Sequence, residues 1–135
     1  MLENFSSELY VLLKNATLNC RSECISLSGG LDSSILAYYL KGKKIASIAV
    51  IAKDFLATDL TYCQMIAKNF DSLLYLKTVT TEELLKGIEE TIKILKIFND
   101  IEIRNAIVMY IALSTAKEKG FTSIITGDGA DELFA

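Results

Sequence analysis

Two glycine-containing segments carry most of the residues that could do chemistry. Residues 28–34 read Ser-Gly-Gly-Leu-Asp-Ser-Ser, and residues 127–132 read Gly-Asp-Gly-Ala-Asp-Glu. Two consecutive glycines let the backbone turn its N–H groups toward a ligand without interference from Cβ atoms. Serine hydroxyls and the start of a following helix add further donors, so the first segment is suited to cradle a pyrophosphate-sized anion.

Asp32 sets a condition on any anion that binds there. A carboxylate inside a phosphate cradle repels the ligand unless a cation lies between them. Mg²⁺ held by one or two carboxylates together with phosphate oxygens meets that condition. The second segment supplies three more carboxylates, those of Asp128, Asp131 and Glu132. The two segments therefore predict one magnesium–phosphate site built from two loops.

Each segment also has a purely structural interpretation. Residues 28–34 could form a tight strand-to-helix turn in which Asp32 or Ser33 caps the helix. Acidic residues near Asp131 could instead stabilise the start of a second helix. The first segment is not a Walker A loop, and the Gly-Lys pair at 42–43 lacks the upstream glycine and the following Ser or Thr of that motif.

Alternating patterns of apolar residues predict the elements that position these segments. Helices are expected over residues 5–16, 32–40, 58–70, 80–95 and 100–119. Strands are expected over residues 23–27, 45–52, 73–79 and 121–126. In the helix over 80–95, the inner face is expected to consist of Leu84, Leu85, Ile88, Ile92 and Leu95.

This alternation predicts an α/β fold with a parallel sheet covered by helices on both faces. Both glycine segments follow strands, so they are expected at the carboxyl edge of the sheet. Open α/β sheets bind ligands at that edge, where the strand order reverses. The length of 135 residues is typical of a single domain, which we expect to span residues 1–135.

Composition excludes several classes of protein. The chain has no histidine, which excludes a Ser-His-Asp triad and any His-ligated metal site. Cys20, Cys24 and Cys63 form no Cys-x-x-Cys motif and are expected to be reduced, as in the cytoplasm. A net charge of −3 opposes a nucleic-acid partner. The apolar run at 45–52 is too short to span a membrane, and the N-terminus does not resemble a secretion signal.

The motifs resemble those of a known family. Residues 28–34 resemble the PP-loop of the ATP pyrophosphatases, which cleave ATP between its α- and β-phosphates. Residues 127–135 resemble the matching loop of the asparagine synthetase and β-lactam synthetase family. Weaker likenesses to the same family lie at Asp59-Leu60, at Asp100, at Ile103-Arg104 and at Met109-Tyr110. The similarity spans residues 23–135 and implies an adenine nucleotide alpha-hydrolase-like three-layer sandwich.

The resemblance implies roles for individual residues. The pyrophosphate would be held by Ser28, Gly29, Gly30, Ser33 and Ser34. The adenine pocket would be lined by Ser26, Val50 and Gly127, and Mg²⁺ would be held by Asp32 and Asp131. Asp128 matches a position, often Glu, that assists proton transfer at the acyl intermediate. Arg104 would shape the substrate pocket, with a surface salt bridge as the alternative.

The function implied by the resemblance is that of an ATP-dependent amide-forming ligase. A carboxylate, aspartate by family default, would be joined to AMP with release of pyrophosphate and then attacked by ammonia. The chain lacks the family's N-terminal glutaminase domain, so ammonia would come free or from a separate glutaminase. It also ends before the family's catalytic lysine, so we expect a C-terminally short fragment or a chain completed by a partner.

Two other functions remain open from the sequence. One is a nucleotide-binding module without catalysis. The other is a tRNA-modifying PP-loop enzyme, which the acidic charge and the motif at 127–135 oppose. The acyl substrate and the oligomeric state do not follow from the sequence.

Overall fold

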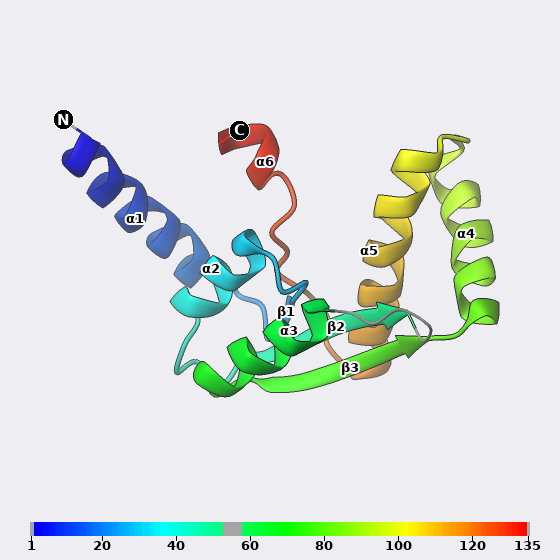
Figure 1. The fold of residues 1–135 in the computed structure, drawn as a ribbon, viewed down its shortest axis with the longest axis horizontal. Coiled ribbons are helices and arrows are strands. Elements are labelled where there is room, and N and C mark those ends of the chain that lie inside the picture. The colour runs from blue at the N-terminus through cyan, green and yellow to red at the C-terminus, as the bar shows by residue number, and fades with distance from the viewer. Residues whose placement is uncertain (1, 53–57, 135) are drawn as a thin grey trace.

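The computed structural model describes residues 2–52 and 58–134. The helices are α1 (Leu2–Asn19), α2 (Leu31–Tyr39), α3 (Thr58–Asn69), α4 (Thr81–Leu95), α5 (Asp100–Glu118) and α6 (Ala130–Phe134) (Figure 1). The strands are β1 (Cys24–Ser26), β2 (Ala46–Ala52) and β3 (Leu73–Val79). The predicted order of helices and strands is therefore confirmed, apart from the last predicted strand.

The strands form a parallel sheet in the order β1-β2-β3. Ile25 pairs with Ser47, and Ser47 pairs in turn with Leu74. Beyond β1, on the edge away from β2, Ile25 also forms a parallel bridge with Ile125. The chain thus steps outward from β1 to β3 and then returns to the other side of β1, so the strand order reverses there.

The predicted strand over 121–126 is wrong in extent, because only the bridge at Ile125 forms. The Ser26 N–H donates to the Ile125 carbonyl oxygen at 2.8 Å, and the Ile125 N–H donates to the Cys24 carbonyl oxygen at 2.9 Å. β1 is itself only three residues long, so it offers few further groups for a ladder. The segment is tethered to the sheet without becoming a full strand.

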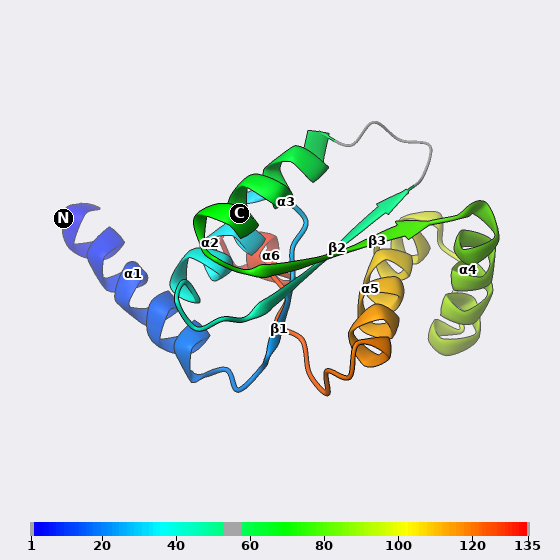
Figure 2. The same cartoon turned by 90° about the horizontal axis from the view of Figure 1, so that it is seen from below.

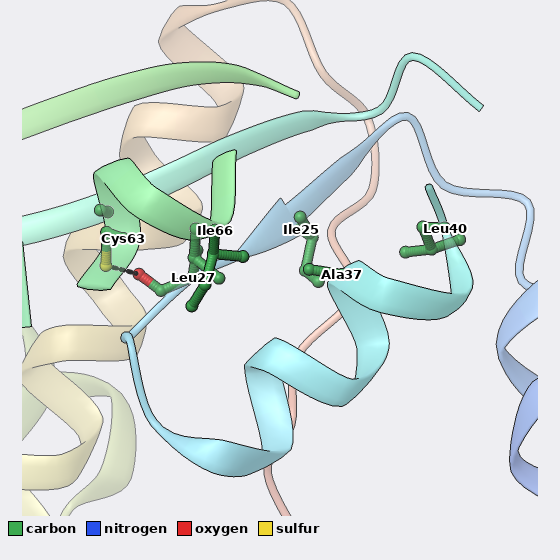
Figure 3. Close-up of a cluster of buried hydrophobic side chains, with 7 residues drawn as sticks. Ile25, Leu27, Ala37, Leu40, Cys63 and Ile66 are labelled. Carbon is green, nitrogen blue, oxygen red and sulfur yellow. Dashed lines mark hydrogen bonds between the residues drawn. The ribbon is translucent and has the colours of Figure 1, made fainter. Parts of the chain in front are cut away.

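Helices cover both faces of the sheet, as predicted. Figures 1 and 2 show α2 and α3 on one face and α5 on the other, with α4 lying outside α5. One core cluster lies between the sheet and the pair α2 and α3, and its buried members are Ile25, Leu27, Ala37, Leu40, Ala49, Cys63 and Ile66 (Figure 3). On the other face, α5 packs over the sheet through two smaller clusters.

None of the three cysteines, all of which lie in the described part of the chain, forms a disulfide bond. Cys63 donates from Sγ to the Leu27 carbonyl oxygen at 3.3 Å, as Figure 3 shows, and so holds the chain just before the first glycine segment. Burial raises the pKa of the Cys24 thiol to about 11. A thiol whose pKa is raised by burial is a poor nucleophile, so the role of Cys24 is to pack in the hydrophobic core.

Helix α1 forms over the predicted range but buries little of its apolar surface. It packs against α2, where Tyr10 and Tyr39 make an edge-to-face contact with ring centroids 5.3 Å apart. Phe5 and Leu12 are 66% and 59% exposed. Among the described residues, no helix combines the length and the apolar character needed to cross a membrane.

Helix α4 packs on α5 through only part of the predicted face. Ile88 and Ile92 contact the α5 cluster as predicted, but Leu84 and Leu85 are exposed. Gly87, which precedes Ile88, is buried against α5, and a Cβ added there would lie 3.6 Å from Cγ2 of Ile107. An added Cβ would make only ordinary van der Waals contact with α5, so Gly87 marks the side of α4 that faces α5.

A capping box starts helix α4. The Thr80 side chain accepts a hydrogen bond from the Glu83 N–H at 3.2 Å, and the Glu83 carboxylate accepts one from the Thr80 N–H at 2.9 Å. Thr80→Ala should lower the free energy of unfolding by about 1 kcal/mol, because it leaves the Glu83 N–H without its acceptor. Urea denaturation measures this, and exposed Thr81→Ala is the control. Equal effects of the two variants would contradict the capping role.

Glu83 also pairs with Lys77, and the hydrogen bond from Lys77 lowers the pKa of the Glu83 carboxyl from its ordinary value. A depressed folded-state pKa stabilises the protein above the unfolded pKa, and this contribution is lost as pH falls through the folded value. Glu83→Gln should therefore be less stable than wild type at pH 7, and the difference should vanish in acid. Denaturation curves at pH 7 and near pH 3 measure it, and a constant difference would exclude the ion pair as the cause.

Candidate functional site

A cavity of about 430 Å³ lies where the strand order reverses. It is bounded by the end of β1, the start of α2, one side of α5 and residues 126–132. The predicted site residues that line it are Ser26, Ser28, Asp32, Ser33, Gly127, Asp128 and Asp131. The two glycine segments thus meet in one cavity, as their positions after parallel strands led us to expect.

The first segment folds back on itself around the buried Ser33. The Ser33 hydroxyl accepts a hydrogen bond from the Ser28 N–H at 3.3 Å and lies 3.0 Å from the Ser28 hydroxyl. The Ser28 hydroxyl in turn accepts a hydrogen bond from the Gly30 N–H at 3.2 Å. Gly29 has a φ of 83°, a conformation that favours glycine. These bonds hold the loop in a fixed shape beside the cavity.

Helix α2 begins without a side-chain cap, which corrects the expectation that Asp32 or Ser33 caps it. Its N-cap is Gly30, and no side chain accepts a hydrogen bond from the first turn. The Ser33 and Ser34 hydroxyls instead donate back to the Gly30 carbonyl oxygen, at 3.3 and 2.6 Å, and Asp32 lines the cavity. The uncapped first turn leaves backbone donors and the positive end of the helix dipole for an anion.

Gly127 brings the second segment against the first. A Cβ added at Gly127 would lie 3.0 Å from Cβ of Asp32 and 3.3 Å from the backbone nitrogen of Ser33. Contacts of 3.0–3.3 Å are tighter than nine in ten real Cβ contacts, so a side chain here would require the start of α2 to give by a few tenths of an ångström. The shape of the cavity therefore depends on this position.

The cavity is strongly acidic. Four carboxylates line it, those of Asp32, Asp128, Asp131 and Glu132, and no Lys or Arg is found among the described residues that line it. Hard oxygen donors of this kind suit Mg²⁺. Among the described residues, no three acidic or cysteine side chains surround a common point. A divalent cation held by Asp32 and Asp131 would therefore take its remaining ligands from phosphate oxygens and water.

Other predicted site residues lie outside the lining of this cavity. Gly29, Gly30 and Ser34 belong to the adjacent loop and the first turn of α2. Val50 packs against the cluster formed by Val79 and α5 and does not line this cavity, but it lies on β2 two residues beyond Ile48, the partner of Ser26.

Arg104 is exposed and forms a salt bridge with Asp100 at 2.7 Å, which corresponds to the alternative interpretation of that residue. The hydrogen bond from Arg104 lowers the pKa of the Asp100 carboxyl. Both residues lie on the first turns of α5, away from the residues that line the cavity.

The structure adds a wall that the sequence analysis did not assign. Asn105, Val108 and Met109 line the cavity from α5. They share one side of the helix, at i, i+3 and i+4, whereas the buried Ile103, Ile107 and Ile111 form another. That spacing in the sequence places the three residues on one side of the helix. Whether that side faces the cavity depends on how α5 packs on the sheet.

Comparison with known proteins assigns the chain to a family. The profile of the asparagine synthase family matches residues 14–135. The chain belongs to the asparagine synthase family. It is 32% identical over 117 residues to a Methanocaldococcus jannaschii protein described as a glutamine-hydrolysing asparagine synthetase. It is 29% identical over 122 residues to a glutamine-hydrolysing asparagine synthetase of Lotus japonicus.

These asparagine synthase matches cover 82% of the chain but 20% of each relative, so the chain spans about one fifth of their length. A solved structure of an NH3-dependent NAD synthetase from Campylobacter jejuni matches with a TM-score of 0.54 and 14% sequence identity. That match covers 87% of this chain and 52% of the other. It confirms the predicted adenine nucleotide alpha-hydrolase-like fold.

The close approach at Gly127 can be tested by adding a single methyl group. Gly127→Ala should lower the free energy of unfolding by about 1–3 kcal/mol, because the start of α2 must shift to admit the new Cβ. Gly87→Ala is the matched control, since its Cβ would meet Ile107 and Ile111 at ordinary distances of 3.6–3.9 Å. That control should be neutral or stabilising by up to about 1 kcal/mol. Urea denaturation compares them, and a neutral Gly127→Ala would argue against the tight contact.

Proposed function

We propose that this chain is the nucleotide-binding part of an ATP-dependent amide-forming ligase. The observation that carries the proposal is the combination, in one cavity, of an uncapped helix start, a glycine loop and four carboxylates. The helix start favours an anion, and the carboxylates favour a cation. A magnesium–nucleotide complex carries both charges, and membership of the asparagine synthase family supports this ligand.

In the proposed reaction, a carboxylate oxygen of the acid attacks the α-phosphorus of ATP. The bond between the α-phosphorus and the bridging oxygen breaks, and pyrophosphate leaves. The nitrogen of ammonia then attacks the acyl carbonyl, loses a proton and displaces AMP. Aspartate is the proposed acid, because the relatives are described as asparagine synthetases. Ammonia would be free or delivered by a separate glutaminase.

The chain's own residues would bind and position the phosphates. Ser28 and the first-turn N–H groups of α2 would donate hydrogen bonds to phosphate oxygens. Asp32 and Asp131 would hold Mg²⁺, which when bound would neutralise charge on the departing pyrophosphate. Asp128 lines the same cavity, and its carboxylate would accept the proton that the attacking ammonia loses.

A second candidate function is nucleotide binding without catalysis. The observation that favours it is the absence of Lys and Arg among the described residues that line the cavity. Phosphoryl-transfer sites usually place a cationic side chain on the leaving phosphates. This chain could then bind ATP while a further part of the protein, or a partner, supplies that group.

Nucleotide binding can be tested by calorimetric titration with ATP, with and without Mg²⁺. Binding should require Mg²⁺, and Asp32→Asn or Asp131→Asn should weaken it at least tenfold, about 1.4 kcal/mol, because each variant removes a metal ligand. Exposed Glu102→Gln on α5 is the charge-matched control. Unchanged affinity in both Asp variants would exclude the metal assignment.

Release of pyrophosphate separates the two candidate functions. Release that depends on both aspartate and ammonia would support the ligase and should fall in Asp128→Asn, which keeps size but removes the proton acceptor. ATP binding without release would favour the second candidate.

A further inference from the structure

The amino ends of the strands form a second surface, at the edge of the sheet opposite the cavity. We call it the amino-edge surface, and it consists of residues 20–23, 41–45 and 117–124. The Ser22 hydroxyl donates to the Ser123 carbonyl oxygen at 2.8 Å. The Ala46 N–H donates to the Glu23 carbonyl oxygen at 3.0 Å. These bonds place the three segments next to one another, where β1 and β2 begin (Figure 2).

The amino-edge surface is basic although the chain is acidic. Its cationic residues are Arg21, Lys41, Lys43, Lys44, Lys117 and Lys119. With Glu23 and Glu118 as its acidic residues, it has a net charge of +4, whereas the whole chain has −3 and the remainder therefore −7. All six cations are exposed, and none forms a salt bridge with a carboxylate in the described part of the chain. The ends of α2 and α5 favour nearby cations, but they do not neutralise this excess of charge.

An apolar groove of about 370 Å³ opens on the same surface. The apolar residues that line it are Leu113, Ala116, Phe121 and Ile124. Leu113 is 47% exposed, so this lining includes apolar surface that a partner could cover. Lys117 lines the groove as well. Ser123, a further lining residue, accepts the hydrogen bond from Ser22, which brings the preceding residue Arg21 close to the groove.

An apolar groove beside cations fits an acidic protein segment that carries an apolar side chain. The apolar side chain would cover Leu113, and carboxylates on either side of it would pair with Lys117 and Arg21. A nucleic-acid backbone fits less well, because it carries a charge at every nucleotide. Such a backbone would meet Glu23 and Glu118 within the basic segments, whereas a peptide can place its carboxylates at the cations alone.

We propose that the amino-edge surface is a docking site for an acidic segment of a partner protein. An apolar side chain of that segment lies in the groove against Leu113, and its carboxylates bind Lys117 and Arg21. The lysines of residues 41–45 extend the basic surface beyond Arg21. Because this surface and the cavity lie at opposite edges of the sheet, the docked segment leaves the cavity open.

Fluorescence anisotropy with two labelled peptides and the whole chain tests the proposal. One peptide consists of glutamates around a central pair of leucines, and the other has serines in place of the leucines. The leucine peptide should bind at least about fivefold more tightly, because the groove removes its apolar side chains from water. Raising the NaCl concentration from about 50 to about 300 mM should weaken the binding of both peptides.

Single substitutions separate the charges from the groove. Lys117→Glu and Arg21→Glu should each weaken the leucine peptide at least about threefold, because each replaces an attraction by a repulsion. Lys86→Glu, the same change at an exposed position of α4, is the matched control and should bind as wild type does. Leu113→Ser should lower the affinity for the leucine peptide to that for the serine peptide and leave the latter unchanged. Circular dichroism verifies that each variant is folded.

The other outcomes would overturn the proposal. These are no binding of either peptide, equal affinity of wild type for the two peptides, and equal losses in Lys117→Glu and Lys86→Glu. Tighter binding of a single-stranded RNA or of phosphatidylserine vesicles, lost in Arg21→Glu, would assign the surface to a nucleic acid or a membrane instead. A dimer in sedimentation velocity that Leu113→Ser and Arg21→Glu both abolish would assign it to a second copy of the chain.

Discussion

The cavity exists because the backbone at Gly127 touches the start of α2. A Cβ at this position would require the start of α2 to shift by a few tenths of an ångström, and the contact follows from the bridge that ties Ile125 to β1. The strand order β1-β2-β3 leads to this contact, because the chain returns from β3 through α4 and α5 to the free edge of β1. Each assignment made above for the cavity depends on this junction of two segments nearly one hundred residues apart in sequence.

Opposite electrostatic preferences meet across the junction. Helix α2 starts with unsatisfied backbone donors, and the facing loop carries carboxylates. Either half alone has an ordinary structural explanation, as a strand-to-helix turn or as an acidic helix start. Together they leave a space whose walls suit a ligand of mixed charge. A nucleotide bound to a divalent cation has that character, and the family assignment points the same way.

Much of this arrangement could be predicted from local patterns. The strands β2 and β3 and the two glycine segments were readable because apolar runs and glycine turns are local signals. The inward face of α4, the extent of the strand at 121–126 and the cavity wall at Asn105 were not, because each depends on contacts between elements. Gly87 shows the reason: its burial follows from how α4 packs on α5, which no local pattern in the sequence reveals.

The tether at Ile125 has a dynamic consequence. β2 is paired along both of its edges, whereas the segment before Gly127 is held to β1 by a single bridge, with one further hydrogen bond from Ser22 Oγ to the Ser123 carbonyl oxygen at 2.8 Å. Regions with so few bonds open locally at a lower free energy than the core of the fold, and their amides exchange sooner with solvent. The half of the cavity formed by residues 126–132 is thus held to the sheet by fewer hydrogen bonds than β2, together with the packing of Ile124 and Ile125 against the core. A ligand that contacts both the start of α2 and residues 126–132 would connect the two segments and slow the amide hydrogen exchange of the second.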